Sequence, residues 1–155
     1  MMSDAFSAIH NYRAVDDRLG TSGQPTEAQL ADVARAGFMT VINLALHDDP
    51  RYSLADEAGT VRSLGLDYVH IPVQFVAPKQ SELLAFFDAM DARTEEKVWM
   101  HCAANYRVTV FLGLYRMVRQ GWPRERAFEL MDGLWKPNDV WAAFIEEALA
   151  KKPSP

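Results

Sequence analysis

Short apolar runs alternate with helical patterns through the middle of the chain. Residues 38–46, 68–73 and 97–101 are apolar runs of strand length, rich in β-branched and aromatic side chains. The segments between them carry apolar residues at helical spacing, such as Leu83 and Phe87. This alternation favours an α/β fold with right-handed crossovers and a mostly parallel sheet. We therefore expect three layers, with a central sheet of about four to five strands flanked by helices.

Local signals place the ends of several expected helices. Thr26 begins a capping box, which is typical of a helix start. Pro123 suits the first turn of a helix that ends near Gly133. Either Asn138 or Asp139 is expected to cap the last helix of the chain.

The length and composition fit one domain. The chain has 155 residues, and 49% of them are hydrophobic, which is enough for one substantial core. We expect a single domain over residues 11–150, with residues 1–10 and 151–155 as flexible tails.

Charge and cysteine content exclude several classes of protein. The net charge of −5 argues against a broad basic surface for nucleic acid. A single cysteine excludes an internal disulfide, and four scattered histidines predict no metal site. Neither a signal peptide nor a membrane span is indicated, so a cytoplasmic protein is expected. The sequence does not indicate the oligomeric state.

The single cysteine lies between an expected strand and an expected helix, in the stretch His101-Cys102-Ala103-Ala104-Asn105-Tyr106-Arg107-Val108-Thr109. In open α/β sheets, sites lie beyond the carboxyl ends of the strands. The loops at residues 43–49 and 73–78 follow the other expected strands. We therefore expect three loops to converge around Cys102.

The residues after Cys102 fit an oxyanion site. A helix N-terminus favours the thiolate, and its free N–H groups can hold an anion against the sulfur. Arg107 adds a planar fork for two oxyanion oxygens, and Asn105 tolerates a left-handed backbone. A free cysteine is usually an inert core residue, but the polar residues that follow are poor core material. The expected anion-binding residues are Ala103, Ala104, Asn105, Tyr106, Arg107 and Val108.

The stretch resembles the signature loop of cysteine-dependent tyrosine and dual-specificity phosphatases: His-Cys, two residues, Gly, two residues, Arg, then Ser or Thr. The chain is more closely similar to a bacterial phosphatase-like family whose relatives occur beside metallo-hydrolase domains. The matching motifs, within residues 11–147, are Ser22-Gly23-Gln24-Pro25, Gly37-Phe38-Met39-Thr40-Val41-Ile42-Asn43-Leu44, His70-Ile71-Pro72-Val73 and the cysteine loop.

The resemblance implies a phosphotyrosine-phosphatase-like fold and a phosphocysteine mechanism without metal or cofactor. Cys102 would be the nucleophile, Thr109 the hydroxyl that assists thiolate chemistry, and His101 the residue that orients the loop from behind. The partner would be a phosphorylated small molecule or a phosphoprotein.

The sequence departs from the phosphatase signature in two places. Asn105 stands at the usual glycine position, and the arginine comes one place early, at Arg107. The loop at residues 74–78 carries no acid, although these phosphatases place their general acid there. Asp48 and Asp49 are the substitute candidates. Because general-acid catalysis contributes about 10²- to 10⁴-fold, a slow enzyme is expected.

Two alternatives remain open. A cysteine followed five places later by arginine also resembles the loop of rhodanese-type sulfurtransferases, in which Cys102 would carry a persulfide. The missing acid and the displaced Arg107 also fit a catalytically degenerate phosphate-binding domain.

Overall fold

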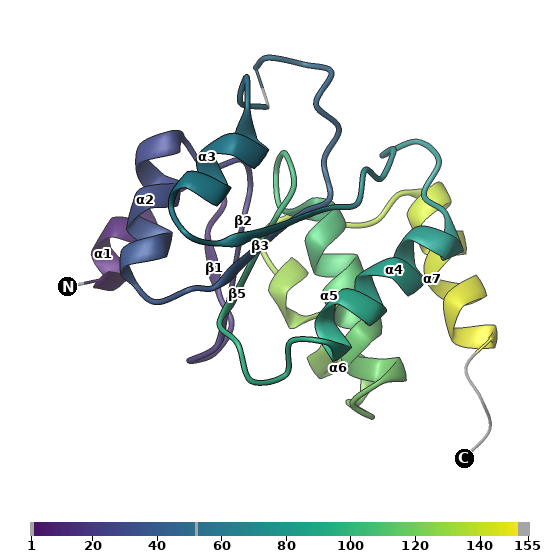
Figure 1. The fold of residues 1–155 in the computed structure, drawn as a ribbon. Helices are drawn as coiled ribbons and strands as arrows, with labels where there is room; N and C mark the ends of the chain where they lie inside the picture. The colour runs from purple at the N-terminus through teal and green to yellow at the C-terminus, as the bar shows by residue number, and fades with distance from the viewer. Residues whose placement is uncertain (1, 52, 152–155) are drawn as a thin grey trace.

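The computed structural model describes residues 2–51 and 53–151, which form one five-stranded sheet between two groups of helices (Figure 1). The strand order is β1-β2-β5-β3-β4; β1 and β2 are antiparallel and the other neighbours are parallel. This confirms the expected α/β fold. The strands are β1 (Arg13–Ala14), β2 (Leu19–Ser22), β3 (Thr40–Asn43), β4 (Asp67–His70) and β5 (Val98–His101).

Helices cover both faces of the sheet (Figure 1). One face carries α1 (Met2–Ser7), α2 (Glu27–Arg35) and α3 (Glu57–Ser63). The other side carries α4 (Gln80–Asp91), α5 (Tyr106–Val118), α6 (Arg124–Ala127) and α7 (Asp139–Ala150). Because α2, α3 and α4 each connect one parallel strand to the next, every crossover brings the chain back to the same edge of the sheet.

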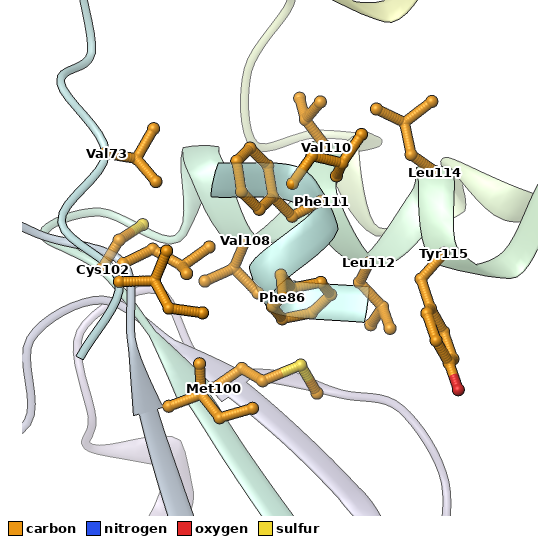
Figure 2. Close-up of a cluster of buried hydrophobic side chains, with 14 of the residues drawn as sticks. Val73, Phe86, Met100, Cys102, Val108, Val110, Phe111, Leu112, Leu114 and Tyr115 are labelled. Carbon is orange, nitrogen blue, oxygen red and sulfur yellow. The ribbon is translucent and has the colours of Figure 1, made fainter. Parts of the chain in front are cut away.

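Each face of the sheet has its own core. The larger core joins the sheet to α4, α5 and α7, and Figure 2 shows Cys102 at its end, on the side of Val73 and Val108. The smaller core joins the sheet to α1, α2 and α3 around the fully buried Trp99. Trp99 and Trp141, one in each core, are inaccessible to solvent.

The helix caps are largely those that the sequence indicates. Thr26 accepts from the backbone N–H three residues on and completes the capping box, and Asn138 caps α7. The prediction of a single helix from Pro123 to near Gly133 is wrong. The segment instead forms α6 and then a separate 3-10 turn at Glu129–Met131. At the break, Phe128 packs against Gly113 of α5, where an added Cβ would lie 2.3 Å from the ring.

The N-terminal segment differs from the flexible tail expected over residues 1–10. Phe6 and Ile9 are buried, and the Phe6 ring lies 4.9 Å from the Trp99 ring. A six-residue helix shows too little periodicity to be recognised in the sequence, yet two apolar residues anchor it. At the other end Lys151 is exposed, and the rest of the expected tail, residues 152–155, lies outside the described residues. None of the described helices has the length and apolarity needed to cross a membrane.

Candidate active site

The last residues of four strands form a row at the carboxyl edge of the sheet. The register of β5 pairs His101 with Ser22 on one side and with Asn43 on the other. Asn43 in turn pairs with His70 of β4. Cys102 follows directly, in the loop between β5 and α5, as the sequence predicts.

The carbonyl groups at the start of the cysteine loop are held away from the cavity beside Cys102. The carbonyl oxygens of residues 102, 103 and 104 accept from His101 Nδ1 (3.2 Å), the Gln24 N–H (3.0 Å) and Asn11 Nδ2 (3.0 Å), respectively. In a trans peptide unit the C=O and the following N–H point in opposite directions. The N–H groups of residues 103–105 are therefore directed to the other side of the loop, as an anion site requires.

Asn105 turns the chain from this loop into α5. It is the N-cap of α5 with a left-handed backbone (φ 70°), which confirms the conformation expected for it. Its Nδ2 donates to the Asn11 carbonyl (3.0 Å) and to Thr21 Oγ1 (3.1 Å). Since the first N–H groups of a helix have no intrahelical acceptor, α5 adds its own free donors and its positive dipole end to this site.

Arg107 lies on the first turn of α5 and is 8% exposed. Its Nη1 donates to the Val73 carbonyl at 2.7 Å, which fixes the plane of the guanidinium. Its Nε is buried and has no hydrogen-bond acceptor among the described residues. An unpaired buried donor of this kind costs about 1–3 kcal/mol, which a bound anion would recover.

Two cavities lie at the cysteine loop and share Arg107. The first measures about 230 Å³ and is lined by Phe75, Cys102, Ala103, Ala104, Tyr106 and Arg107. The second measures about 200 Å³ and is lined by Ala45, Leu46, Asp48, Asp49, Phe75, Ala103 and Arg107. The loops after β3, β4 and β5 all contribute, so the expected convergence of three loops around Cys102 is confirmed.

The two aspartates of the second cavity differ in their surroundings. Asp49 pairs with Arg51 at 2.8 Å, and the hydrogen bonds and charge of Arg51 lower the pKa of Asp49. Asp48 is exposed and borders the cavity beside Arg107. Arg51 binds both carboxylate oxygens of Asp49, which leaves Asp48 as the better candidate.

The Thr109 hydroxyl has two partners other than Cys102. It donates to the Tyr106 carbonyl (2.7 Å) and accepts from Trp135 Nε1 (2.9 Å), so its one proton is engaged in the first of these bonds. The Tyr106 ring also stacks on Trp135 at 4.8 Å. Thr109 therefore braces the first turn of α5. The Val108 side chain is fully buried, so only its backbone N–H could reach an anion.

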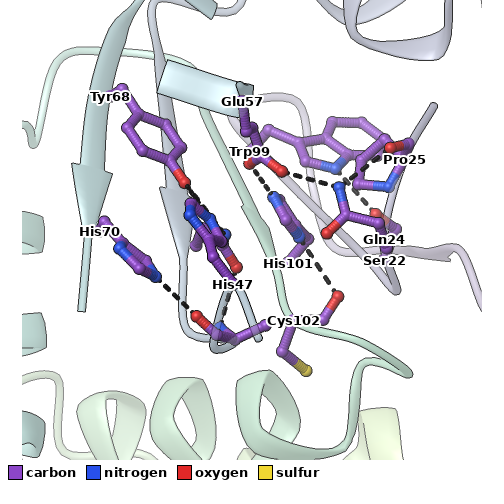
Figure 3. Close-up of polar contacts among 12 residues, drawn as sticks. Ser22, Gln24, Pro25, His47, Glu57, Tyr68, His70, Trp99, His101 and Cys102 are labelled. Atoms are coloured by element: carbon purple, nitrogen blue, oxygen red, sulfur yellow. Dashed lines mark hydrogen bonds and ion pairs between the residues drawn. The ribbon is translucent and has the colours of Figure 1, made fainter. Parts of the chain in front are cut away.

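Behind the loop, His101 is paired with Glu57, the first residue of α3 (Figure 3). His101 Nε2 lies 2.5 Å from Glu57 Oε2, and both side chains are fully buried. Gln24 Nε2 donates to the other carboxylate oxygen at 2.7 Å. Burial favours a raised Glu57 pKa, but the charge and hydrogen bond of His101, with help from Gln24, hold this pKa below its usual value. Sequence reasoning missed Glu57, since nothing distinguishes it among 21 acidic residues.

The other two histidines at this edge also lie together, although the sequence suggested only scattered ones. The His47 ring stacks on the His70 ring at 4.2 Å, and His47 Nε2 lies 3.0 Å from both Tyr68 Oη and Asn43 Nδ2 (Figure 3). His70 is exposed, and it donates to the Ala45 carbonyl. Within residues 2–51 and 53–151, no group of three His, Cys, Asp or Glu could hold a metal ion.

Comparison with known proteins places the chain among bacterial phosphatase-like domains. Residues 11–117 match the family described as "Beta-lactamase hydrolase-like protein, phosphatase-like domain". Beta-lactamase hydrolase-like proteins of two Xylella fastidiosa strains, Temecula1 and 9a5c, are 30% identical to it over 130 residues, or 83% of this chain. The chain spans 27% of the length of these relatives.

Solved structures show the same fold. A phosphatase candidate from Shewanella putrefaciens CN-32 superposes with a TM-score of 0.86 at 31% identity, covering 97% of this chain and 99% of the other. TpbA from P. aeruginosa superposes with a TM-score of 0.70 at 24% identity, covering 89% and 84%. Kinase associated phosphatase superposes with a TM-score of 0.73 at 11% identity, covering 86% of each chain.

The mostly parallel sheet with a cysteine loop at its carboxyl edge therefore defines a domain of the tyrosine and dual-specificity phosphatase fold. Within that class, the chain belongs to the family of phosphatase-like domains of beta-lactamase hydrolase-like proteins.

Proposed function

We propose that this domain hydrolyses phosphomonoesters through a phosphocysteine on Cys102. The observation that carries the proposal is Arg107 Nε, a buried donor without an acceptor among the described residues, on a guanidinium that borders the cysteine cavity. Nη1 is already bound to the Val73 carbonyl, so the unpaired edge of the fork is available to an oxyanion. The early position of Arg107 in the sequence is thus compatible with a role as the phosphate clamp.

The reaction has two steps. The Cys102 thiolate attacks phosphorus, the S–P bond forms, and the bond to the leaving oxygen breaks while that oxygen takes up a proton. Water then attacks phosphorus, the S–P bond breaks, and one water proton returns to the group that protonated the leaving oxygen; phosphate leaves and the thiolate is restored. Loop N–H groups and Arg107 stabilise the charge on the equatorial oxygens in both steps.

Asp48 is the proposed proton donor. It borders the second cavity, which shares Phe75, Ala103 and Arg107 with the cysteine cavity. A leaving group that extended from the first cavity into the second would lie beside Asp48. Because Asp48 lies in an exposed loop, its positioning costs entropy, and we expect slow turnover of substrates with poor leaving groups.

The proposed substrate is a phosphorylated small molecule or a phosphoprotein. The support is the fold shared with TpbA, for which a complex of a cysteine-to-serine variant with pTyr is known. Phe75 and Tyr106 line the cysteine cavity, and their rings could contact an apolar or aromatic leaving group.

The test compares wild type, Cys102→Ser and Arg107→Ala on 4-nitrophenyl phosphate and on a phosphotyrosine peptide. We expect no turnover by Cys102→Ser and a large loss in Arg107→Ala. Equal turnover by wild type and Cys102→Ser would overturn the proposal. Thiocyanate formation from thiosulfate and cyanide, without phosphatase turnover, would favour the sulfurtransferase alternative. Oxyanion binding without any turnover would favour the alternative of a catalytically degenerate phosphate-binding domain.

A further inference from the structure

The pair formed by Glu57 and His101 determines the charge directly behind the nucleophile. His101 Nδ1 lies 3.2 Å from the Cys102 carbonyl, and Nε2 lies 2.5 Å from Glu57 Oε2 (Figure 3). A carbonyl oxygen can only accept, so Nδ1 carries a proton. The other oxygen of the Glu57 carboxylate accepts from Gln24 Nε2, and an ionised carboxylate only accepts, so beside it Nε2 carries a proton as well. With both nitrogens protonated, the His101 ring is positively charged.

This positive charge is well placed to act on Cys102. His101 precedes Cys102 in the chain and binds its carbonyl, whereas Glu57 lies on the far side of the imidazole. The positive member of the pair is therefore nearer to the sulfur than the negative member. Because both side chains are fully buried, solvent only weakly screens the net effect of the nearer cation and the more distant anion on the sulfur.

The neighbouring titratable groups do not replace Glu57 in this arrangement. His47 follows β3, Tyr68 and His70 lie on β4, and Arg62 is on the exposed side of α3. The Tyr68 phenol stays neutral, since burial and the charge of Glu57 raise its pKa. Glu57 is thus the carboxylate that contacts His101 directly.

We propose that Glu57 is a positioning residue for Cys102: it keeps His101 doubly protonated, and this cation fixes the Cys102 carbonyl and favours the thiolate. Gln24 completes the arrangement, because its Nε2 holds the second carboxylate oxygen and its backbone N–H holds the Ala103 carbonyl. The segments that contain Gln24 and Glu57, both far from Cys102 in the sequence, therefore act together to favour the ionised form of its sulfur. The inference rests on the proposed role of Cys102 as a reactive thiolate.

The experiment measures the rate of iodoacetamide alkylation of Cys102 between pH 5 and pH 9 in the full chain. Cys102 is the sole cysteine, so mass spectrometry reports on it alone. In Glu57→Gln we expect the midpoint of the alkylation profile to rise by about one pH unit, which is about a tenfold slower reaction below the wild-type midpoint. Glu57→Asp, which keeps the charge, should recover most of the wild-type profile.

Asp56→Asn is the matched control. Asp56 is the exposed N-cap of the same helix, so this variant removes the same charge one residue away and keeps a capping side chain. Its profile should match wild type. An unchanged midpoint in a folded Glu57→Gln variant would overturn the inference, as would equal shifts in Glu57→Gln and Asp56→Asn.

A measurement on the wild type keeps the inference testable if Glu57→Gln does not fold. Nitrogen-15 spectra of the imidazole rings should show His101 doubly protonated at pH 7.5; a single tautomer there would overturn the inference. The same profiles distinguish a failure of this inference from a failure of the proposed function. A wild-type alkylation profile like that of a free thiol would contradict the reactive thiolate that the proposed function needs. A low wild-type midpoint that Glu57→Gln leaves unchanged would contradict only the role of Glu57.

Discussion

Replacing Arg107 with lysine keeps the positive charge of this residue and removes its planar guanidinium, so the two contributions to anion binding can be measured apart. In the structure Nη1 is bound to the Val73 carbonyl at 2.7 Å, and Nε remains for a ligand together with the second terminal nitrogen. Lysine keeps the charge but can offer one donor in place of two parallel ones. A hydrogen bond to a charged group contributes about 1.5–3 kcal/mol. We therefore expect Arg107→Lys to weaken the binding of tungstate or phosphate by about 10- to 100-fold.

The assay is isothermal titration calorimetry with tungstate at fixed ionic strength, with thermal unfolding measured beside it. Loss of the bond to the Val73 carbonyl should cost about 1.5–3 kcal/mol of stability, or roughly 3–12 °C in Tm. Arg119→Lys is the control, because Arg119 caps the other end of α5 and pairs with Asp91 at the exposed surface. Equal tungstate affinity in wild type and Arg107→Lys would refute the reasoning that the fork holds the anion.

Changes elsewhere at the site have separate expected outcomes. Asp48→Asn should lower kcat/KM for phenyl phosphate by about 10²-fold and leave a dinitrophenyl phosphate nearly unchanged, whereas Asp49→Asn should affect neither. Gly23→Ala would place a Cβ 2.5 Å from the Ala103 carbonyl oxygen, so calorimetry should show weaker tungstate binding. The lowered pKa of Glu57 means that its contribution to stability is complete above about pH 4.3, its unfolded value, and is lost as pH falls through the folded value. Denaturant titrations of wild type should therefore show a steeper loss of stability on acidification than those of Glu57→Gln.

Each of these expectations has a contradicting result. Equal losses of phenyl phosphate turnover in Asp48→Asn and Asp49→Asn would remove Asp48 as the proton donor. Wild-type tungstate affinity in Gly23→Ala would show that the loop does not depend on this close approach. Parallel stability curves for wild type and Glu57→Gln at acidic pH would contradict an ionised Glu57 in the folded protein.

The fold and the cysteine loop were predictable because their signals are local. Strand runs and helix spacing are read within windows of a few residues, and the carboxyl edge of a parallel sheet follows from the crossovers. The placement of Cys102 between β5 and α5 and the left-handed Asn105 both follow from adjacent residues.

The support of the loop was not predictable because it comes from distant segments. Asn11 binds the loop across 93 positions, and Glu57 binds His101 across 44. The requirement that a buried histidine have an acceptor points to some carboxylate or carbonyl, but only the register of β3, β4 and β5 and the start of α3 decide which one. The partners of the Thr109 hydroxyl were not predictable either, since Trp135, 26 positions away, supplies one of them.

The central claim is that the Cys102 sulfur takes the phosphoryl group. Rapid acid quenching of the wild type during turnover of 4-nitrophenyl phosphate, followed by peptide mass spectrometry, tests it most directly. We expect one phosphoryl group on the peptide that contains Cys102, and none after the same treatment of Cys102→Ser. Steady turnover by wild type with an unmodified Cys102 at every quench time, or a phosphoryl group on another residue, would contradict the claim.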